Sequence, residues 1–344
     1  MEKIKAFWNW FDAHKDAYAN FTKQYNNDLE QINAALNKMI DQLQKVSEGL
    51  FVEIGGGEAP WELIITPQGA KDFFADAFAV VQEAPDYPDW KILATKPAYG
   101  TDFSFRMGDV EISPDTVRFI PLEMEDRPDD IAIRLFHSDY QEGKAGNAVV
   151  MGIYQALDSL LGEVSTTFDI DYLEFSSAPE EGINPLPLSE LAGYIRWKKK
   201  ERPLSGVRFP EDQVSLLQGE NNGKPIIIIV NQQLRNYEFK TEYPYILKVT
   251  LLFDEVSEEG FPVGSMDAVY AIEDQLQKRL GQEANGHFLV TETYDGKRKI
   301  HFAGASKEVL ETQVNVLKKE LKSPYTIQYD IYFDPFWVSA SGYM

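Results

Sequence analysis

Asp169 and Asp171 are the two carboxylates whose spacing most directly suggests chemistry. They lie two positions apart in a segment, 168–175, whose sequence predicts a β-strand. Because alternate residues of a strand share a face, both side chains would point the same way and could bind a hard cation or act as acid and base. In a chain this acidic, such a pair also arises by chance. Solvated surface carboxylates are the simpler interpretation.

The short motifs of common enzymes are absent from the sequence. Gly55, Gly56 and Gly57 lack a following Gly-x-x-Gly spacing and lie between two predicted strands, which favours a hairpin loop over a phosphate-binding loop. No Gly-x-Ser-x-Gly, Gly-Lys-Ser/Thr or His-Glu-x-x-His motif occurs. No residue is therefore predicted to be catalytic, and an enzyme is the less favoured interpretation.

The chain has no cysteine, and its four histidines, at positions 14, 137, 287 and 301, are scattered along the sequence. Metal sites usually combine clustered ligands at short spacings, so we expect neither a metal site nor a cofactor. His14 is predicted to pack on the aromatic face of the first helix. His301 alternates with Ile300 and Phe302, and is therefore predicted to lie on a polar strand face beside Lys299.

Trp8 and Trp10 are candidates for binding a partner. They belong to a predicted helix over 4–18 in which apolar residues recur every three or four positions. Successive helix residues point about 100° apart, so Trp8 and Trp10 cannot both face one narrow core stripe. One of the two is expected to dock against the rest of the protein or against a partner.

The charge of the chain excludes several classes of ligand. Its 344 residues carry 55 Asp and Glu against 33 Lys and Arg, a formal charge of −22. Residues 1–178 account for −17 of this and residues 179–344 for −5. We expect no binding to nucleic acid or to anionic membranes, because such a surface repels phosphates. The absence of cysteine favours the cytoplasm, and the N-terminal residues do not resemble a secretory signal.

Hydrophobic periodicity predicts an acidic α+β module over 1–178. A second helix begins near Leu29, with Asn26 or Asn27 as its N-cap and Gly49 as its stop. The module is completed by predicted strands at 51–54, 61–66, 90–95, 116–124, 131–137 and 168–175, and by helices at 73–81 and 150–161.

Residues 179–225 are rich in proline and predict a connector with one short helix over 190–200, capped by Ser189.

A second module is predicted over 226–344. It has strands at 226–231, 245–253, 288–294, 297–302 and 326–333, a helix from Ser265 and another capped by Ser306. Asp295 and Gly296 predict a type I′ hairpin. From 245 the order is β-α-β-β-α-β, the ferredoxin-like pattern. The first module shares an α-β-β-α-β stretch with it and has extra strands. This pattern suggests a divergent duplication, and a chance match is the alternative, because helix and strand lengths vary little among proteins.

The segment from about 224 to 344 resembles the bacterial family called domain of unknown function 695. The resemblance rests on Glu259-Gly260-Phe261-Pro262, Ile272-Glu273-Asp274, Tyr294-Asp295-Gly296-Lys297-Arg298 and Asp334-Pro335-Phe336-Trp337. It implies a ferredoxin-like fold similar to that of the B-type regulators of ribonuclease E, and it carries over no catalytic residue. The N-terminal half resembles only unannotated bacterial proteins with a Phe-Trp-x-Trp-Phe start.

These observations favour a non-catalytic interaction or regulatory protein of the bacterial cytoplasm, whose acidic first module contacts a basic protein partner. An immunity-type protein that neutralises a basic toxin is a narrower form of this hypothesis. The alternative is a small-molecule-binding protein or enzyme with an aromatic cleft between the modules. The sequence does not predict an oligomeric state.

Overall fold

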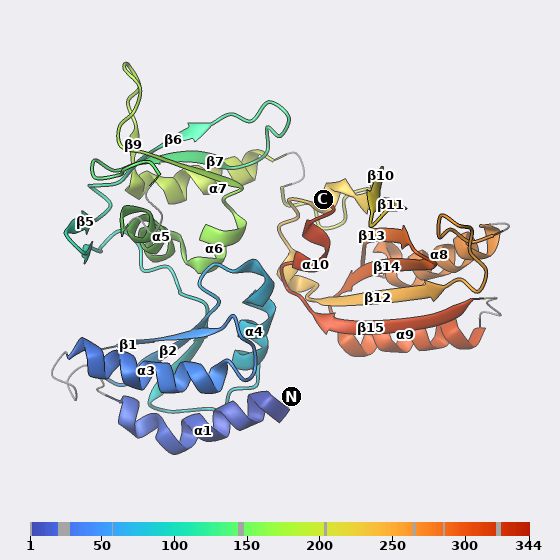
Figure 1. Cartoon of the computed structure of the whole chain (residues 1–344), viewed down its shortest axis with the longest axis horizontal. Coiled ribbons are helices and arrows are strands. Elements are labelled where there is room, and N and C mark those ends of the chain that lie inside the picture. Colours follow the sequence, from blue (N-terminus) through green and yellow to red (C-terminus); the bar gives the residue numbers. More distant parts are fainter. Residues whose placement is uncertain are drawn as a thin grey trace. The chain divides into compact units, whose positions relative to one another are not determined.

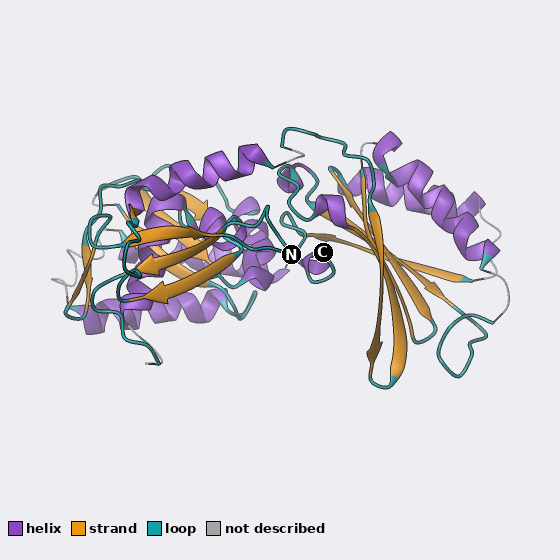
Figure 2. Cartoon of the chain, turned by 90° about the horizontal axis from the view of Figure 1, so that it is seen from above, coloured by secondary structure: helices purple, strands orange, loops and turns teal. Residues whose placement is uncertain are grey.

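The computed structural model describes residues 2–19, 28–56, 58–143, 148–202, 205–263, 266–284, 286–320 and 325–344. The chain divides into two compact units, Met1–Pro203 and Leu204–Met344. The division falls inside the segment 179–225 that the sequence predicts as a connector. Helices and strands are mixed in both units (Figures 1 and 2), so the predicted α+β class is confirmed.

The first unit begins with a three-stranded sheet packed against helices. Its elements are α1 (Glu2–Tyr18), α3 (Leu29–Leu43), β1 (Phe51–Gly55), β2 (Trp61–Thr66), α4 (Phe74–Gln82) and β3 (Trp90–Ala94). β1 and β2 form the predicted antiparallel hairpin, whereas β2 and β3 pair in parallel. The N-cap of α3 is Asp28, whose carboxylate accepts the backbone N–H of Glu30 and Gln31. The predicted caps Asn26 and Asn27 lie outside the described residues.

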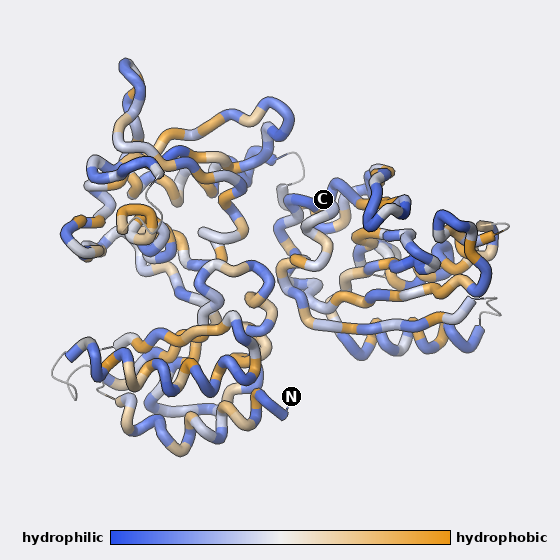
Figure 3. The backbone as a smooth tube through the Cα atoms, in the orientation of Figure 1, coloured by the Kyte–Doolittle hydropathy of each residue, from blue (hydrophilic) through white to orange (hydrophobic). Residues whose placement is uncertain are grey.

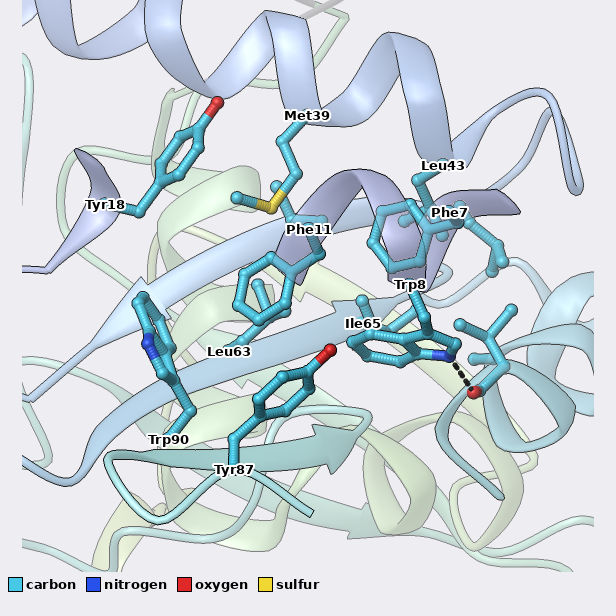
Figure 4. Packing of buried hydrophobic residues seen from close by; sticks show 14 of the residues in the cluster. Phe7, Trp8, Phe11, Tyr18, Met39, Leu43, Leu63, Ile65, Tyr87 and Trp90 are labelled. Atoms are coloured by element: carbon cyan, nitrogen blue, oxygen red, sulfur yellow. Dashed lines mark hydrogen bonds between the residues drawn. The ribbon is translucent and has the colours of Figure 1, made fainter. Parts of the chain in front are cut away.

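Aromatic side chains dominate the core between α1, α3 and this sheet (Figure 4). The alternating colours of α1 and α3 in Figure 3 follow the apolar periodicity of their sequences. Trp8 and Phe11 project from α1 and meet Tyr87 and Trp90 in tilted and edge-to-face contacts, and Phe7 meets Trp8 edge to face. The opposite face of the sheet carries Glu53, Ile64 and Thr66 toward the second half of the unit.

The second half of the first unit contains a small hairpin, a four-stranded sheet and three helices. Its elements are β4 (Phe105–Met107), β5 (Val110–Ile112), β6 (Arg118–Leu122), β7 (Ala132–Phe136), α5 (Ala148–Leu161), α6 (Glu163–Phe168), β8 (Tyr172–Ser176), β9 (Leu186–Pro187) and α7 (Leu191–Glu201). The strand order is β8-β7-β6-β9. Apolar residues of α5 and α7 pack with those of β6 and β7 in one core. No side-chain cap precedes α7, so the predicted capping by Ser189 is wrong.

The second unit is one six-stranded sheet with two long helices on the same side (Figure 2). Its elements are β10 (Val214–Asn221), β11 (Lys224–Asn231), β12 (Tyr245–Leu252), α8 (Asp267–Leu280), β13 (His287–Tyr294), β14 (Lys297–Gly304), α9 (Lys307–Glu320), β15 (Thr326–Phe333) and α10 (Val338–Ser341). Short 3-10 turns in the chain are Lys71–Phe73, Leu188–Glu190, Gln232–Leu234, Lys240–Glu242 and Gln282–Ala284.

The strand order β10-β11-β13-β14-β12-β15 places β12 between two strands that follow it in the sequence. All neighbouring strands are antiparallel. Asp295 and Gly296 both have positive φ, 47° and 73°, so the predicted hairpin between β13 and β14 is confirmed. Ser306 caps α9 through the backbone N–H of Val309, as predicted. The predicted helix start at Ser265 lies outside the described residues, and α8 begins at Asp267.

Candidate functional site

A cleft of about 890 Å³ opens within the first unit, and we call it the Lys96 cleft. One wall is formed by Glu53 of β1 and by the loops that follow β2 and β3. The other wall is formed by α5, by α6 and by residues 170–173 at the start of β8. The cleft therefore lies where the two halves of the first unit meet.

Lys96 lies among carboxylates in this cleft. Its Nζ is 2.9 Å from Asp158 Oδ2 and 3.4 Å from Glu53 Oε1, and the side chains of Lys96 and Asp158 are 17% and 13% exposed. Burial lowers the pKa of Lys96, but the carboxylates Asp158 and Glu53 outweigh that effect and hold the pKa above its ordinary value. Lys96 is therefore a charged ammonium that is already neutralised, and it is not a candidate nucleophile.

Glu163 joins the two halves of the unit behind the cleft. Its carboxylate is fully buried and accepts hydrogen bonds from Thr66 Oγ1 at 2.7 Å, the Gly69 N–H at 2.9 Å and the Lys96 N–H at 3.1 Å. The Thr66 hydroxyl also accepts the N–H of Gln68, so its single proton is directed to Glu163. Burial raises the pKa of Glu163, and the three donors oppose that shift.

The backbone geometry around Glu163 requires glycine. Gly162 precedes α6 with a φ of 82°, and a Cβ there would lie 3.2 Å from the backbone N of Ala98. The Glu163 N–H in turn donates to Lys96 O at 2.9 Å. The chain after β3 and the start of α6 are thus bound to each other through backbone and side chain.

Exposed aromatic side chains line the Lys96 cleft. Tyr99, Tyr154 and Tyr172 are 57%, 44% and 41% exposed, and Met151 is 57% exposed. Thr166 also lines the cleft; it is only 7% exposed and its hydroxyl has no hydrogen-bond partner among the described residues. The cleft thus combines aromatic faces and carboxylates, which are groups that bind rather than groups that activate a nucleophile.

Asp169 and Asp171 do not share a strand face, so that prediction is wrong. β8 begins only at Tyr172, because Asp169 is the C-cap of α6. Asp169 accepts hydrogen bonds from Ser165 Oγ and Lys199 Nζ, whereas Asp171 accepts the N–H of Ile131. Only Asp171 lines the Lys96 cleft. Within the described residues, no three His, Asp or Glu side chains are grouped as metal ligands.

Trp8 is the tryptophan of α1 that docks against the rest of the protein. It is 3% exposed, and its Nε1 donates to Val80 O at 2.9 Å (Figure 4). Trp10 is half-buried at the edge of the same core and stacks on His14 at 4.5 Å between ring centroids. The contact of Trp10 with a partner stays a prediction.

His287 and His301 lie buried in the second unit. His287 is fully buried among aromatic rings, with centroids 4.5 Å from Tyr243, 4.7 Å from Tyr237 and 5.2 Å from Phe209, and neither ring nitrogen has a hydrogen-bond partner in the described part of the chain. Burial lowers its pKa to about 4. His301 lies on the same strand face as Lys299, as predicted, but it is only 6% exposed, so this face is covered there.

Residues 215–339 match the family of unknown function DUF695. We call this segment the DUF695 region; it confirms the predicted resemblance, contains the four motifs on which that resemblance rests, and lies within the second unit. The Lys96 cleft lies outside it. No curated protein and no solved structure showed significant similarity to the chain. No helix in the described part of the chain is long and apolar enough to cross a membrane.

Proposed function

We propose that the chain is a non-catalytic binding protein and that its first unit binds a basic segment of a partner protein. The observation that carries this proposal is the Lys96 cleft, where two carboxylates, Glu53 and Asp158, share the single ammonium of Lys96 beside exposed tyrosines. The third carboxylate of the lining, Asp171, is paired with Arg202. A lysine or arginine side chain of the partner would stack on the tyrosines and approach the carboxylates.

The charge of the first half of the chain supports the same partner. Residues 1–178 carry a formal charge of −17, which attracts a basic segment over distances beyond direct contact. The cysteine-free composition favours the cytoplasm as the place of this interaction. We also propose a ferredoxin-like fold for the DUF695 region, supported by the order β12-α8-β13-β14-α9-β15 and the all-antiparallel arrangement of these strands.

A labelled ten-residue peptide with four lysines tests the proposal by fluorescence anisotropy. We expect it to bind the full chain, and we expect the double variant Glu53→Gln, Asp158→Asn to bind it about tenfold more weakly, because the variant leaves Lys96 unpaired in the cleft. The matched control is Asp109→Asn, Glu125→Gln, which removes two exposed carboxylates of the same unit outside the cleft.

Equal losses in the two double variants would show that bulk charge, and not the cleft, binds the peptide. A peptide with glutamate in place of each lysine is expected not to bind. Raising the salt concentration is expected to weaken binding of the lysine peptide, because the encounter is electrostatic.

The second candidate function is the binding of a small molecule, which the volume of the cleft and its exposed tyrosines favour. A metabolite library screened by thermal shift distinguishes the two. A compound that raises the melting temperature and competes with the lysine peptide would identify the cleft as a small-molecule site.

A further inference from the structure

β10 is an edge strand of the second unit that exposes apolar side chains. It pairs with β11 on one side and ends the sheet on the other. Val214, Leu216 and Leu217 are 55%, 60% and 40% exposed. Proteins usually protect such an edge with charges, proline or a bulge, because free backbone groups attract another strand. Glu220 is the one charged residue of β10.

The backbone of β10 presents a regular set of free hydrogen-bonding groups. Asn222 and Gly223, with φ of 50° and 76°, form a two-residue turn flanked by the pair Asn221 and Lys224. In an antiparallel pair, hydrogen-bonded and non-hydrogen-bonded positions alternate. Counting from the turn, the N–H and C=O groups of Val214, Leu216 and Gln218 point to the open edge. An added strand would find a hydrogen-bonding partner at every second residue.

An apolar cavity lies next to this edge on the helix side of the sheet. It has a volume of about 230 Å³ and is lined by Val214, Ile229, Phe288, Ile300 and Phe302, among others. In the described residues, the core under α8 and α9 is built from β12 to β15 and includes no residue of β10 or β11. The helices thus leave the β10–β11 end of the sheet uncovered.

Carboxylates surround the mouth of this cavity. A neighbouring groove of about 720 Å³ is lined by Glu211, Asp212, Asp274 and Lys278. The Asp212 carboxylate is held by amide groups, from Asn231 at 2.7 Å and Gln277 at 3.0 Å. No ion pair joins Glu211, Asp212 or Asp274 to a cation among the residues that the structure describes. The rim therefore carries three carboxylates against one ammonium, that of Lys278.

We propose that β10 is the docking edge for an extended segment of a partner protein, with alternating apolar residues and a flanking basic residue. The segment adds to the sheet as a further strand beside β10. Its apolar side chains cover Val214 and Leu216, and its basic residue meets the carboxylates Glu211 and Asp274 at the rim. This site is independent of the Lys96 cleft, because it lies in the DUF695 region and its immediate surroundings.

A displayed library of random ten-residue peptides, selected on the full chain and counter-selected on the variant Gln218→Pro, tests the proposal. Proline at position 218 removes an N–H from the open edge without removing a bond to β11. We expect peptides with alternating apolar residues and a flanking lysine or arginine to be enriched. Their synthetic consensus is expected to slow hydrogen exchange at residues 214–220.

The consensus peptide is expected to bind the variants Leu216→Lys and Gln218→Pro at least tenfold more weakly than the unmodified chain. The control Val309→Lys, which adds the same charge at a residue of α9 that is 56% exposed, is expected to change the affinity less than twofold. Failure to enrich any sequence, or equal affinity for all variants, overturns the proposal. If sedimentation shows a dimer that Leu216→Lys converts to a monomer, the edge binds a second copy instead and the proposal is likewise overturned.

Discussion

We expect the second unit to lose stability as the pH falls from about 6.5 to about 4. Burial lowers the pKa of both His287 and His301 to about 4, and for His301 the nearby ammonium of Lys248 adds to the shift. Between these pH values the unfolded chain takes up protons that the folded unit does not, so acid favours unfolding. At pH 4, each histidine has lowered the free energy of unfolding of this unit by about 3 kcal/mol.

The variant His287→Phe separates the contribution of His287 from that of His301. Phenylalanine keeps a ring against Tyr237 and Tyr243 and removes two nitrogens that have no hydrogen-bond partner among the described residues. We expect the variant to be more stable than the unmodified chain at pH 7 by about 1 kcal/mol, and to lose about 3 kcal/mol less between pH 6.5 and pH 4.

Native-state hydrogen exchange of β13 and β14 at pH 5 and pH 7, corrected for the intrinsic rates, measures the effect. The control is His14→Phe, because His14 is exposed on α1 and belongs to the other unit. If the stability of β13 and β14 in the unmodified chain does not change with pH over this range, the buried histidines are not the cause we assign.

Replacing Glu163 is expected to destabilise the first unit by about 3 kcal/mol or more. In Glu163→Ala the hydroxyl of Thr66 and the N–H groups of Gly69 and Lys96 keep their buried positions and lose their acceptor. Glu163→Gln is expected to cost about half as much, because its amide has one acceptor oxygen for donors that approach from both sides.

Urea denaturation of the first unit, followed through hydrogen exchange of β2 and β3, provides the measurement. Glu58→Ala serves as the control, since Glu58 is an exposed carboxylate of the same unit. Equal stability of the Glu163→Ala and Glu58→Ala variants would show that the buried carboxylate contributes nothing to joining the two halves.

Elements with a strong apolar period or a specific turn could be predicted from the sequence. The helix over 4–18 is one example, because one of its faces is buried and its apolar residues recur with the helical period. The Asp295–Gly296 hairpin is another, because its two turn residues must adopt positive φ. β10 shows the opposite case. Nearly all of its residues are exposed, so no alternation marks it, and the turn at Asn222 and Gly223 is the signal from which it could have been found.

The candidate site could be predicted only in part. Asp171 is the predicted site residue that lines the Lys96 cleft. The prediction that it shares a strand face with Asp169 was wrong, because α6 extends to Phe168 and β8 begins only at Tyr172. Glu163 could not have been found, since a glutamate in the first turn of a helix is ordinarily a favourable surface residue. Its partners, Thr66, Gly69 and Lys96, are distant in the sequence and meet it only in the folded unit.

The position of β12 in the middle of the second sheet has a consequence for synthesis of the chain. Val249 pairs with Ile300 on one side and with Tyr329 on the other, and both follow it in the sequence. A nascent chain therefore leaves the apolar residues of β12 without either neighbour until β14 and then β15 have left the ribosome. Contacts of such long sequence separation are slow to form, so this unit is expected to fold late. It is also expected to need protection from aggregation between the synthesis of β12 and that of β15. The β1–β2 hairpin of the first unit can form as soon as it emerges.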